Sequence, residues 1–423
     1  MKKIVIALTL PWLLQAQSIG ELFDALKHHS QTKSDEIAVQ KSEVQQKLVY
    51  ANLYPKINLF GSYDNYSSPT NVKPIAPYRI KPMLANPSIA QPYSYNVSRA
   101  GANFSMPIFV KSLYTTADKA KVIQKSAKAK KHINLLKNEA LIVGTNANYL
   151  YLNSLLEALD VKEESLQETK KTTQIKVDNG RAPASALYKI DDALNGVAIA
   201  KNNLELQKKK LISTIQTLTG IVLDKPATIQ EIGSYTKGKM GALQPLQEKL
   251  RADRLGIKAE KEKLYPTLTA HGSYTFLKAD AYNNGKNVNE EYGNVGVVLN
   301  IPLLAMDNYA SIKLAKVKLQ ASEVELEKLR EELKAEADML EGSLPLLDNS
   351  YRLYTQSVAD KQKLLDIAKV AYKSGRISTE EYLRYEDALV AKKAEIYKVE
   401  ATKWQTLMQL AVIYGNNIEE MVK

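Results

Sequence analysis

An internal repeat constrains the fold of this 423-residue chain more than any other feature of its sequence. Residues 53–63 share Leu-Tyr-Pro and Gly-Ser-Tyr with residues 264–274, at an offset of 211 residues. Further along, residues 101–107 match residues 296–302 at an offset of 195. The difference means that the first half carries 16 more residues in the loop between its two matched segments. Because a repeat of this kind fixes the architecture, we expect two similar structural halves.

Each half is predicted to run in the order helix, strand, loop, strand, very long helix, sharp turn and helix. The first repeat is assigned to residues 17–221 and the second to 243–423, with a connector at 222–242. Strands are expected at 57–66, 93–106, 267–277 and 292–301, which gives hairpins over 57–106 and 267–301. The long helices are expected at 108–177 and 304–373, the returning helices at 185–218 and 380–413, and shorter helices at 19–53 and 243–264. Pro345 is expected to interrupt and bend the second long helix, because proline lacks the backbone donor.

The strand candidates have one apolar and one polar face. In residues 267–277, Leu, Ala, Gly, Tyr and Phe alternate with Thr, His and Ser, which is the period-two pattern of a strand. After the N-terminal segment, no stretch holds the ~18 uninterrupted apolar residues that a membrane helix needs, so entry into a membrane would be as strands. A membrane sheet must close on itself, and four strands are too few, since barrels begin at about eight. We therefore expect several copies to share one barrel, and three copies would give a ring of about twelve strands.

The N-terminus has the layout of a secretory signal peptide. Met1, Lys2 and Lys3 precede an apolar run at 4–14, and the small residue Ala16 marks the expected cleavage site. The alternative is a short buried N-terminal helix. The chain has no cysteine, which excludes disulfides, thiolate metal sites and an acylated N-terminal Cys as lipid anchor. The sequence thus predicts export of a protein without a lipid anchor, with residues 1–16 removed.

The composition disfavours nucleic-acid binding. The net charge of +12 comes from 58 basic and 46 acidic residues spread along the predicted helices, which is typical of solvated helix faces. The 24 tyrosines outnumber the 5 phenylalanines and 2 tryptophans. Tyrosine combines an apolar ring with a hydroxyl group, so it suits membrane interfaces and water-filled channels.

The order and spacing of these elements resemble the TolC-like family of outer-membrane efflux proteins. The local pieces that carry the resemblance are Met-Pro-Ile-Phe at 106–109, Ile-Pro-Leu-Leu at 301–304, and the two turn segments around Gly180 and Gly375. The resemblance covers residues 17 to about 414. It implies a mostly α-helical homotrimer with a twelve-stranded barrel in the outer membrane of a Gram-negative bacterium, continued by a long α-helical tunnel in the periplasm. It also implies contact with outer-membrane lipid and docking to a periplasmic adaptor protein and an inner-membrane efflux transporter.

The two turn segments are candidate contact sites for the adaptor. Gly180 and Gly375 are accounted for by helix capping alone, and Ser378 by opening the next helix. Arg181 and Arg376 are not required by capping. Since the resemblance implies that these turns lie at the periplasmic tip, it marks all five residues as the adaptor-binding site, beside the purely structural interpretation.

Acidic residues follow each turn and are candidates for a gate at the tunnel mouth. Acids at the start of a helix stabilise its positive end, which is the simpler explanation. Arranged three-fold around a narrow mouth, they would form a cation-favouring ring and could pair with Arg376 or Arg384. The candidate gate comprises Asp191, Asp192, Glu381, Arg384 and Asp387, with Glu380 and Glu386 beside them. Four prolines mark the expected junctions between strands and helices: Pro55, Pro107, Pro266 and Pro302.

No motif for catalysis, a metal or a cofactor is visible in the sequence. The four histidines stand in no metal-ligand spacing, and there is no P-loop, nucleophile elbow or glycine-rich dinucleotide turn. We therefore expect a passive exit duct of a tripartite efflux pump that is not an enzyme and draws its energy from a partner. The alternatives are the outer-membrane channel of type I protein secretion, a structural coiled-coil surface protein, and a soluble periplasmic scaffold.

Overall fold

The computed structural model describes residues 18–423, so the signal peptide predicted at 1–16 lies outside the described residues. The chain forms two compact units, and both repeats contribute segments to each of them. Unit 1 contains the residues up to 39 together with 128–245 and 326–423, and unit 2 contains residues 40–127 and 246–325. The units reflect packing, whereas the predicted repeat boundaries describe sequence similarity and stay a prediction.

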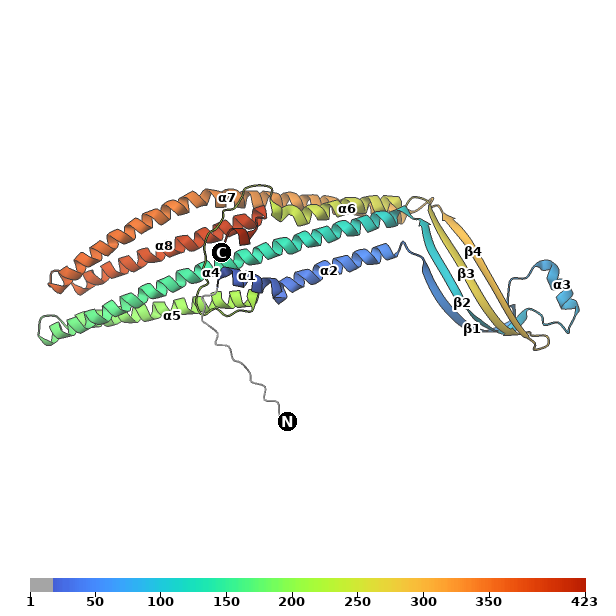
Figure 1. Ribbon diagram of the computed structural model, residues 1–423, viewed down its shortest axis with the longest axis horizontal. Helices are drawn as coiled ribbons and strands as arrows, with labels where there is room; N and C mark the ends of the chain where they lie inside the picture. Colours follow the sequence, from blue (N-terminus) through green and yellow to red (C-terminus); the bar gives the residue numbers. More distant parts are fainter. Residues whose placement is uncertain (1–17) are drawn as a thin grey trace, which may run out of the picture. The chain divides into compact units, whose positions relative to one another are not determined.

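Unit 2 is built on one antiparallel four-stranded sheet in the order β1-β2-β3-β4. Figure 1 shows the four strands side by side. Their bounds are β1 Lys56–Asn71, β2 Tyr93–Phe109, β3 Thr267–Asp280 and β4 Asn287–Asn300. The prediction of four strands is confirmed, but the strands are longer than predicted, mostly at the ends nearest their hairpin loops. Since β2 pairs with β3, the two repeats join in a single sheet.

One face of the sheet is apolar and exposed. The register places Leu59, Ala102, Tyr274 and Gly293 in one row across the four strands, and Ile57, Phe104, Gly272 and Val295 in the next row. Ile57, Leu59 and Val295 are 70%, 85% and 83% exposed. Gly272 is needed here, because a Cβ atom at this position would lie 2.4 Å from the ring of Phe104. The opposite face carries a polar row: Asn58, Asn103, Ser273 and Asn294.

The longer loop of the first repeat contains a short helix that the sequence analysis missed, α3 at Pro77–Ala85. After it, the chain is fastened to the β3–β4 turn. The side chain of Asn283 donates to the carbonyl oxygens of Pro87 and Ile89 at 3.2 and 3.0 Å and accepts from the N–H of Gln91 at 3.1 Å. These bonds satisfy backbone groups that a strand ladder would otherwise pair, so the loop has a defined conformation.

The helices follow the predicted order with three differences. Their bounds are α1 Ile19–His28, α2 Ser30–Ala51, α4 Lys111–Asp178, α5 Ser185–Thr219, α6 Gln244–Glu262, α7 Met306–Lys373 and α8 Thr379–Tyr414. The single helix predicted at 19–53 is wrong, because His29 is extended and separates α1 from α2. Both long helices begin slightly later than predicted. Pro345 does not interrupt α7, because Leu340 and Leu344 in the preceding turn pack against the end of α8 and hold the helix there.

The main core of unit 1 joins the chain ends to the long helices. Apolar side chains of α1 pack with α4, α5, α8 and the connector between α5 and α6. In the connector, Leu223 and Ala227 are buried, and Asn146 of α4 bonds both the carbonyl and the N–H of Ala227, at 2.9 and 2.8 Å. Gln230 and Lys423 exchange two backbone hydrogen bonds of 2.7 and 2.9 Å. The connector is therefore an integral part of this core.

Candidate functional site

The two helix-hairpin turns close their helices in the same way. Gly180 and Gly375 have φ values of +68° and +76°, the left-handed conformation that glycine adopts without strain. The N–H groups of Arg181 and Arg376 donate to the carbonyls of Lys176 and Ala371, at 2.7 and 2.9 Å. This bond spans six residues, as in a Schellman motif, so the turns are rigid ends of the helices.

The turn residues differ in how their side chains are used. Arg181 and Arg376 are exposed, and among residues 18–423 neither guanidinium group has a hydrogen bond or ion pair. Ser378 caps α8, since its hydroxyl accepts from the N–H of Glu381 at 3.2 Å. The arginines are therefore available to another molecule, whereas Ser378 already has a structural role.

The candidate gate acids pair with lysines rather than with arginines in this chain. Asp191 of α5 pairs with Lys170 of α4 at 2.6 Å, and Asp387 of α8 pairs with Lys162 of α4. Lys189 also links α5 to Glu380 of α8 at 2.8 Å, and this ion pair lowers the pKa of Glu380. Within the described range, Asp192 and Arg384 are exposed and make no such contact, and the Glu381 backbone is occupied by the helix cap. The ion pairs thus connect neighbouring helices of one chain.

Beside these ion pairs lies a buried polar network that the sequence analysis did not assign. Glu386 of α8 is only 4% exposed, and its Oε1 accepts from the hydroxyls of Ser165 on α4 and Tyr382 on α8. Tyr382 stacks on Tyr372 of α7, with ring centroids 5.0 Å apart, and the Tyr372 hydroxyl meets that of Thr173 on α4 at 2.8 Å. The network therefore connects three helices. The tyrosines on both sides of the second turn were the only sequence signal for it.

The carboxyl group of Glu386 is buried and only partly hydrogen-bonded in this network. Glu386 Oε2 is buried without a hydrogen-bond partner within the described part of the chain. Burial raises the pKa of Glu386, while the Ser165 and Tyr382 hydroxyls and Lys162 act in the opposite direction. Burial also raises the pKa of Tyr382 to about 12, so its hydroxyl remains a donor. An ionised Glu386 is costly here, and any motion that admits water would relieve that cost.

The four predicted junction prolines lie at or near the ends of strands. Pro55 and Pro266 immediately precede β1 and β3, and Pro302 follows β4 by two residues. Pro107 instead lies inside β2, beside an irregularity in its pairing with β3. Since proline cannot donate to a ladder, that irregularity is where its missing N–H is tolerated.

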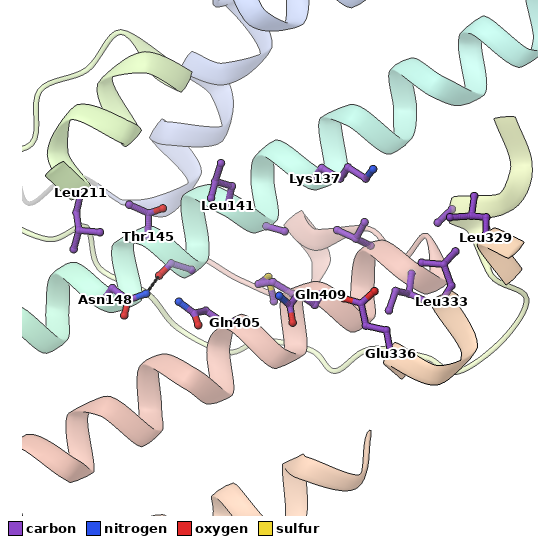
Figure 2. A pocket seen from close by; sticks show the side chains of 16 residues that line it. Lys137, Leu141, Thr145, Asn148, Leu211, Leu329, Leu333, Glu336, Gln405 and Gln409 are labelled. Carbon is purple, nitrogen blue, oxygen red and sulfur yellow. Dashed lines mark hydrogen bonds between the residues drawn. The ribbon is translucent and has the colours of Figure 1, made fainter. Parts of the chain in front are cut away.

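A cavity of about 580 Å³ in unit 1 is lined by residues of α4, α7 and α8 (Figure 2). Its wall is mostly apolar, with Leu141 and Leu333 among the lining side chains, and Lys137 and Glu336 supply one charge of each sign. At Gly144 an added Cβ would approach Gln405 to 3.1 Å, so the glycine keeps α4 and α8 close. The cavity lies between helices of the two repeats.

No helix within residues 18–423 combines the length and the hydropathy needed to cross a membrane. The sequence profile described as "Outer membrane efflux protein" matches residues 241–416, which span α6, β3, β4, α7 and α8. Residues 241–416 are therefore similar to this family of outer membrane efflux proteins. The family consists of channel proteins rather than enzymes, and its members lie in the outer membrane of Gram-negative bacteria and extend into the periplasm.

The fold of the whole chain is that of solved outer-membrane channels. The Campylobacter jejuni CmeC channel superposes with a TM-score of 0.78 at 18% identity, covering 96% of this chain and 90% of CmeC. VceC of Vibrio cholerae gives 0.76 at 13% identity, with coverages of 94% and 96%. The open state of the Neisseria gonorrhoeae MtrE channel gives 0.75 at 15% identity, with coverages of 94% and 89%. At identities this low, the similarity shows a shared fold alone. A comparison with curated proteins found no match to this sequence.

Proposed function

We propose that three copies of this chain form a passive exit duct of a tripartite efflux pump, which carries small molecules from the periplasm to the exterior. The observation that supports this most directly is the sheet of unit 2. It has an exposed apolar face and two edges, β1 and β4, that have no partner strand among residues 18–423. In a membrane, unpaired edges are too costly, and four strands cannot close a barrel alone. Three copies would pair β1 of one with β4 of the next in a barrel of twelve strands.

The helices of unit 1 favour a duct over a coiled-coil surface fibre. α4 with α5 and α7 with α8 form antiparallel hairpins with tight turns, and ion pairs such as Lys189–Glu380 link one hairpin to the other. A fibre would need one continuous seam of heptads instead. The outer-membrane channel of type I protein secretion has the same requirements as an efflux duct and remains the second candidate.

The partners follow from the free arginines at the turns. We assign Gly180, Arg181, Gly375, Arg376 and Ser378 to the contact with a periplasmic adaptor protein, which in turn would join an inner-membrane efflux transporter. The exposed, unpaired guanidinium groups of Arg181 and Arg376 suit a partner with acidic or carbonyl groups. Asp191, Asp192, Glu381, Arg384 and Asp387 belong in this proposal to a gate beside the turns, which the buried network around Glu386 holds closed.

Assembly and conduction are tested together on the purified protein. The natural chain has no cysteine, so cysteines introduced at Asn58 in β1 and Asn294 in β4 are the only thiols. A flexible bis-maleimide should convert the double variant to covalent trimers, whereas each single variant should give none. The protein should also form stepwise, cation-favouring conductance in planar bilayers. A water-soluble monomer that neither cross-links nor conducts would exclude the duct and favour the periplasmic scaffold.

A further inference from the structure

A second, smaller cavity in unit 1 has an unusual lining. Its volume is about 310 Å³, at the lower end of the range of ligand pockets. It lies between one face of α4 and one face of α8, because on each helix the lining positions recur at intervals of three and four residues, and Ile229 of the connector closes one side. The residues that line it are Ala147, Leu150, Tyr151, Ser154, Ile229, Tyr397, Glu400, Ala401 and Trp404.

Three of these side chains are aromatic. Tyr151, Tyr397 and Trp404 are half-buried, and Ala147 and Ala401, which line the same cavity, are buried. None of the three rings takes part in a cation–π contact with a lysine or arginine among residues 18–423. The π faces of these rings are therefore available to a cation from outside the chain.

The charge at this cavity is negative. Glu400 lines the cavity and is exposed, and within the described residues its carboxylate makes no hydrogen bond or ion pair. The nearby Lys403 is engaged elsewhere, with Asp348 at 2.8 Å, and Glu231 adds a further negative charge close to that lysine. Desolvation raises the pKa of Glu400, and Lys403 only partly opposes it. The local field therefore favours a cation beside Glu400.

The larger cavity of Figure 2 differs from the smaller one in the charge and the aromatic content of its lining. Lys137 and Glu336 there carry opposite charges, and no aromatic side chain lines it. That cavity offers apolar surface but no preference for a charge sign. The smaller cavity combines aromatic faces with an unpaired carboxylate, which is the combination that recognises quaternary ammonium groups.

We propose that the cavity formed by Tyr151, Tyr397, Glu400 and Trp404 binds small organic cations, such as quaternary ammonium compounds and protonated amines. The aromatic rings attract the cation by their π faces and exclude water, and the Glu400 carboxylate supplies the counter-charge. The proposal rests on this cavity alone and not on the exit-duct function. Binding is measured without conduction, so either proposal can fail without the other.

Tryptophan fluorescence tests this directly. The chain has two tryptophans, Trp12 in the predicted signal peptide and Trp404 in the cavity wall. In the full chain carrying Trp12→Phe, purified in an uncharged maltoside detergent, all tryptophan emission comes from Trp404. Choline should change this emission saturably. Its uncharged carbon analogue, 3,3-dimethylbutan-1-ol, has nearly the same shape and should bind at least tenfold more weakly.

Two variants separate charge from shape. Glu400→Gln keeps the side-chain volume and the Trp404 signal but removes the counter-charge, so choline affinity should fall at least fivefold. Tyr397→Leu removes one aromatic face and should weaken choline binding by a similar factor. Glu395→Gln lies on α8 outside the lining and serves as the matched control, with unchanged affinity.

Three results would overturn the proposal. The first is a choline response that does not saturate, or no response at all, as expected if a neighbouring subunit fills the cavity. The second is equal binding of choline and its neutral analogue, which would indicate an apolar site only. The third is an equal loss of affinity in Glu400→Gln and Glu395→Gln, because a general change in surface charge would then account for both.

Discussion

The turns of the two repeats are alike in backbone and unlike in surroundings. At the offset of 195 residues, Glu386 corresponds to Asp191, and Tyr382 corresponds to Leu187. Asp191 forms a half-exposed ion pair with Lys170, whereas Glu386 is buried and bonded to hydroxyl groups. The repeat thus preserves the turn while only its second copy supplies a latch, by which we mean the contacts of Glu386, Tyr382 and Tyr372 with α4. Of the two hairpins, the α7–α8 hairpin is the one whose release requires breaking a buried polar network.

The largest effect is expected from removing the stacked ring of the latch. Tyr382→Ala deletes a buried aromatic side chain and should lower the local stability of the second turn by about 3–5 kcal/mol. Hydrogen exchange of amides in residues 365–390 should accelerate by roughly two to four orders of magnitude. Leu187→Ala changes the matching position, which is only half-buried. It should accelerate amide exchange in residues 170–195 by less than about tenfold.

If Tyr382→Ala and Leu187→Ala accelerated amide exchange equally at their respective turns, the two turns would be equivalent and the second would have no latch. Tyr382→Phe keeps the stacking on Tyr372 and loses only the bond to Glu386, so it should lower the local stability by much less than Tyr382→Ala, by about 1 kcal/mol.

The second effect concerns pH. Burial raises the pKa of Glu386 while the latch is formed, so the form with an intact latch holds a proton more tightly than any form in which this carboxyl meets water. The latched form is therefore fully stabilised below the ordinary pKa of glutamate, and this stabilisation is lost as the pH rises through the raised pKa of Glu386. The other charged groups that face Glu386 are Lys162 of α4, which favours its ionised form, and Asp387 of α8, which opposes it.

If the latch holds the proposed gate shut, conductance of the assembled channel should increase as the pH rises above the ordinary pKa of glutamate. Glu386→Gln imitates the protonated carboxyl and should give low conductance with little pH dependence. Asp191→Asn is the matched control, because its ion pair is half-exposed, and it should keep the wild-type profile. The exchange of amides in residues 365–390, followed over the same pH range, tests the latch even if no current is observed. A pH profile that survives Glu386→Gln would remove Glu386 from this role.

The sequence predicted most of the fold, and local patterns explain why. The alternation in residues 267–277 and the helical spacing of the long helices depend on neighbouring residues, so both are legible in one chain. The break at His29 and the short helix α3 were missed, because neither has a strong capping or periodic signal.

The latch could not be predicted from a single sequence, because it depends on contacts between residues far apart in the chain. Ser165 and Glu386 are separated by 221 positions, and Glu386 is buried only because α4 and α8 pack together. In the sequence, Glu386 and Asp387 are adjacent acids that look equally exposed. The structure separates them, since Asp387 is exposed beside Lys162 and Glu386 faces the hydroxyl groups. Which of two neighbouring acids is buried is decided by helix rotation.

The smallest effect is expected at the ion pair of the first turn. Lys170 and Asp191 are both more than two-fifths exposed, so solvent screens their attraction and the side chains lose entropy on pairing. Lys170→Ala should therefore lower the free energy of local opening, measured by amide exchange in residues 170–195, by no more than about 0.5 kcal/mol. A salt concentration of about 0.5 M should abolish even that difference. Lys162→Ala, which removes the partner of Asp387 next to buried Glu386, should have the larger effect and should raise the pKa of Glu386 further. If the two lysines proved interchangeable in size of effect and in salt dependence, the second turn would hold no buried latch, and the two repeats would contribute equally to holding the hairpins together.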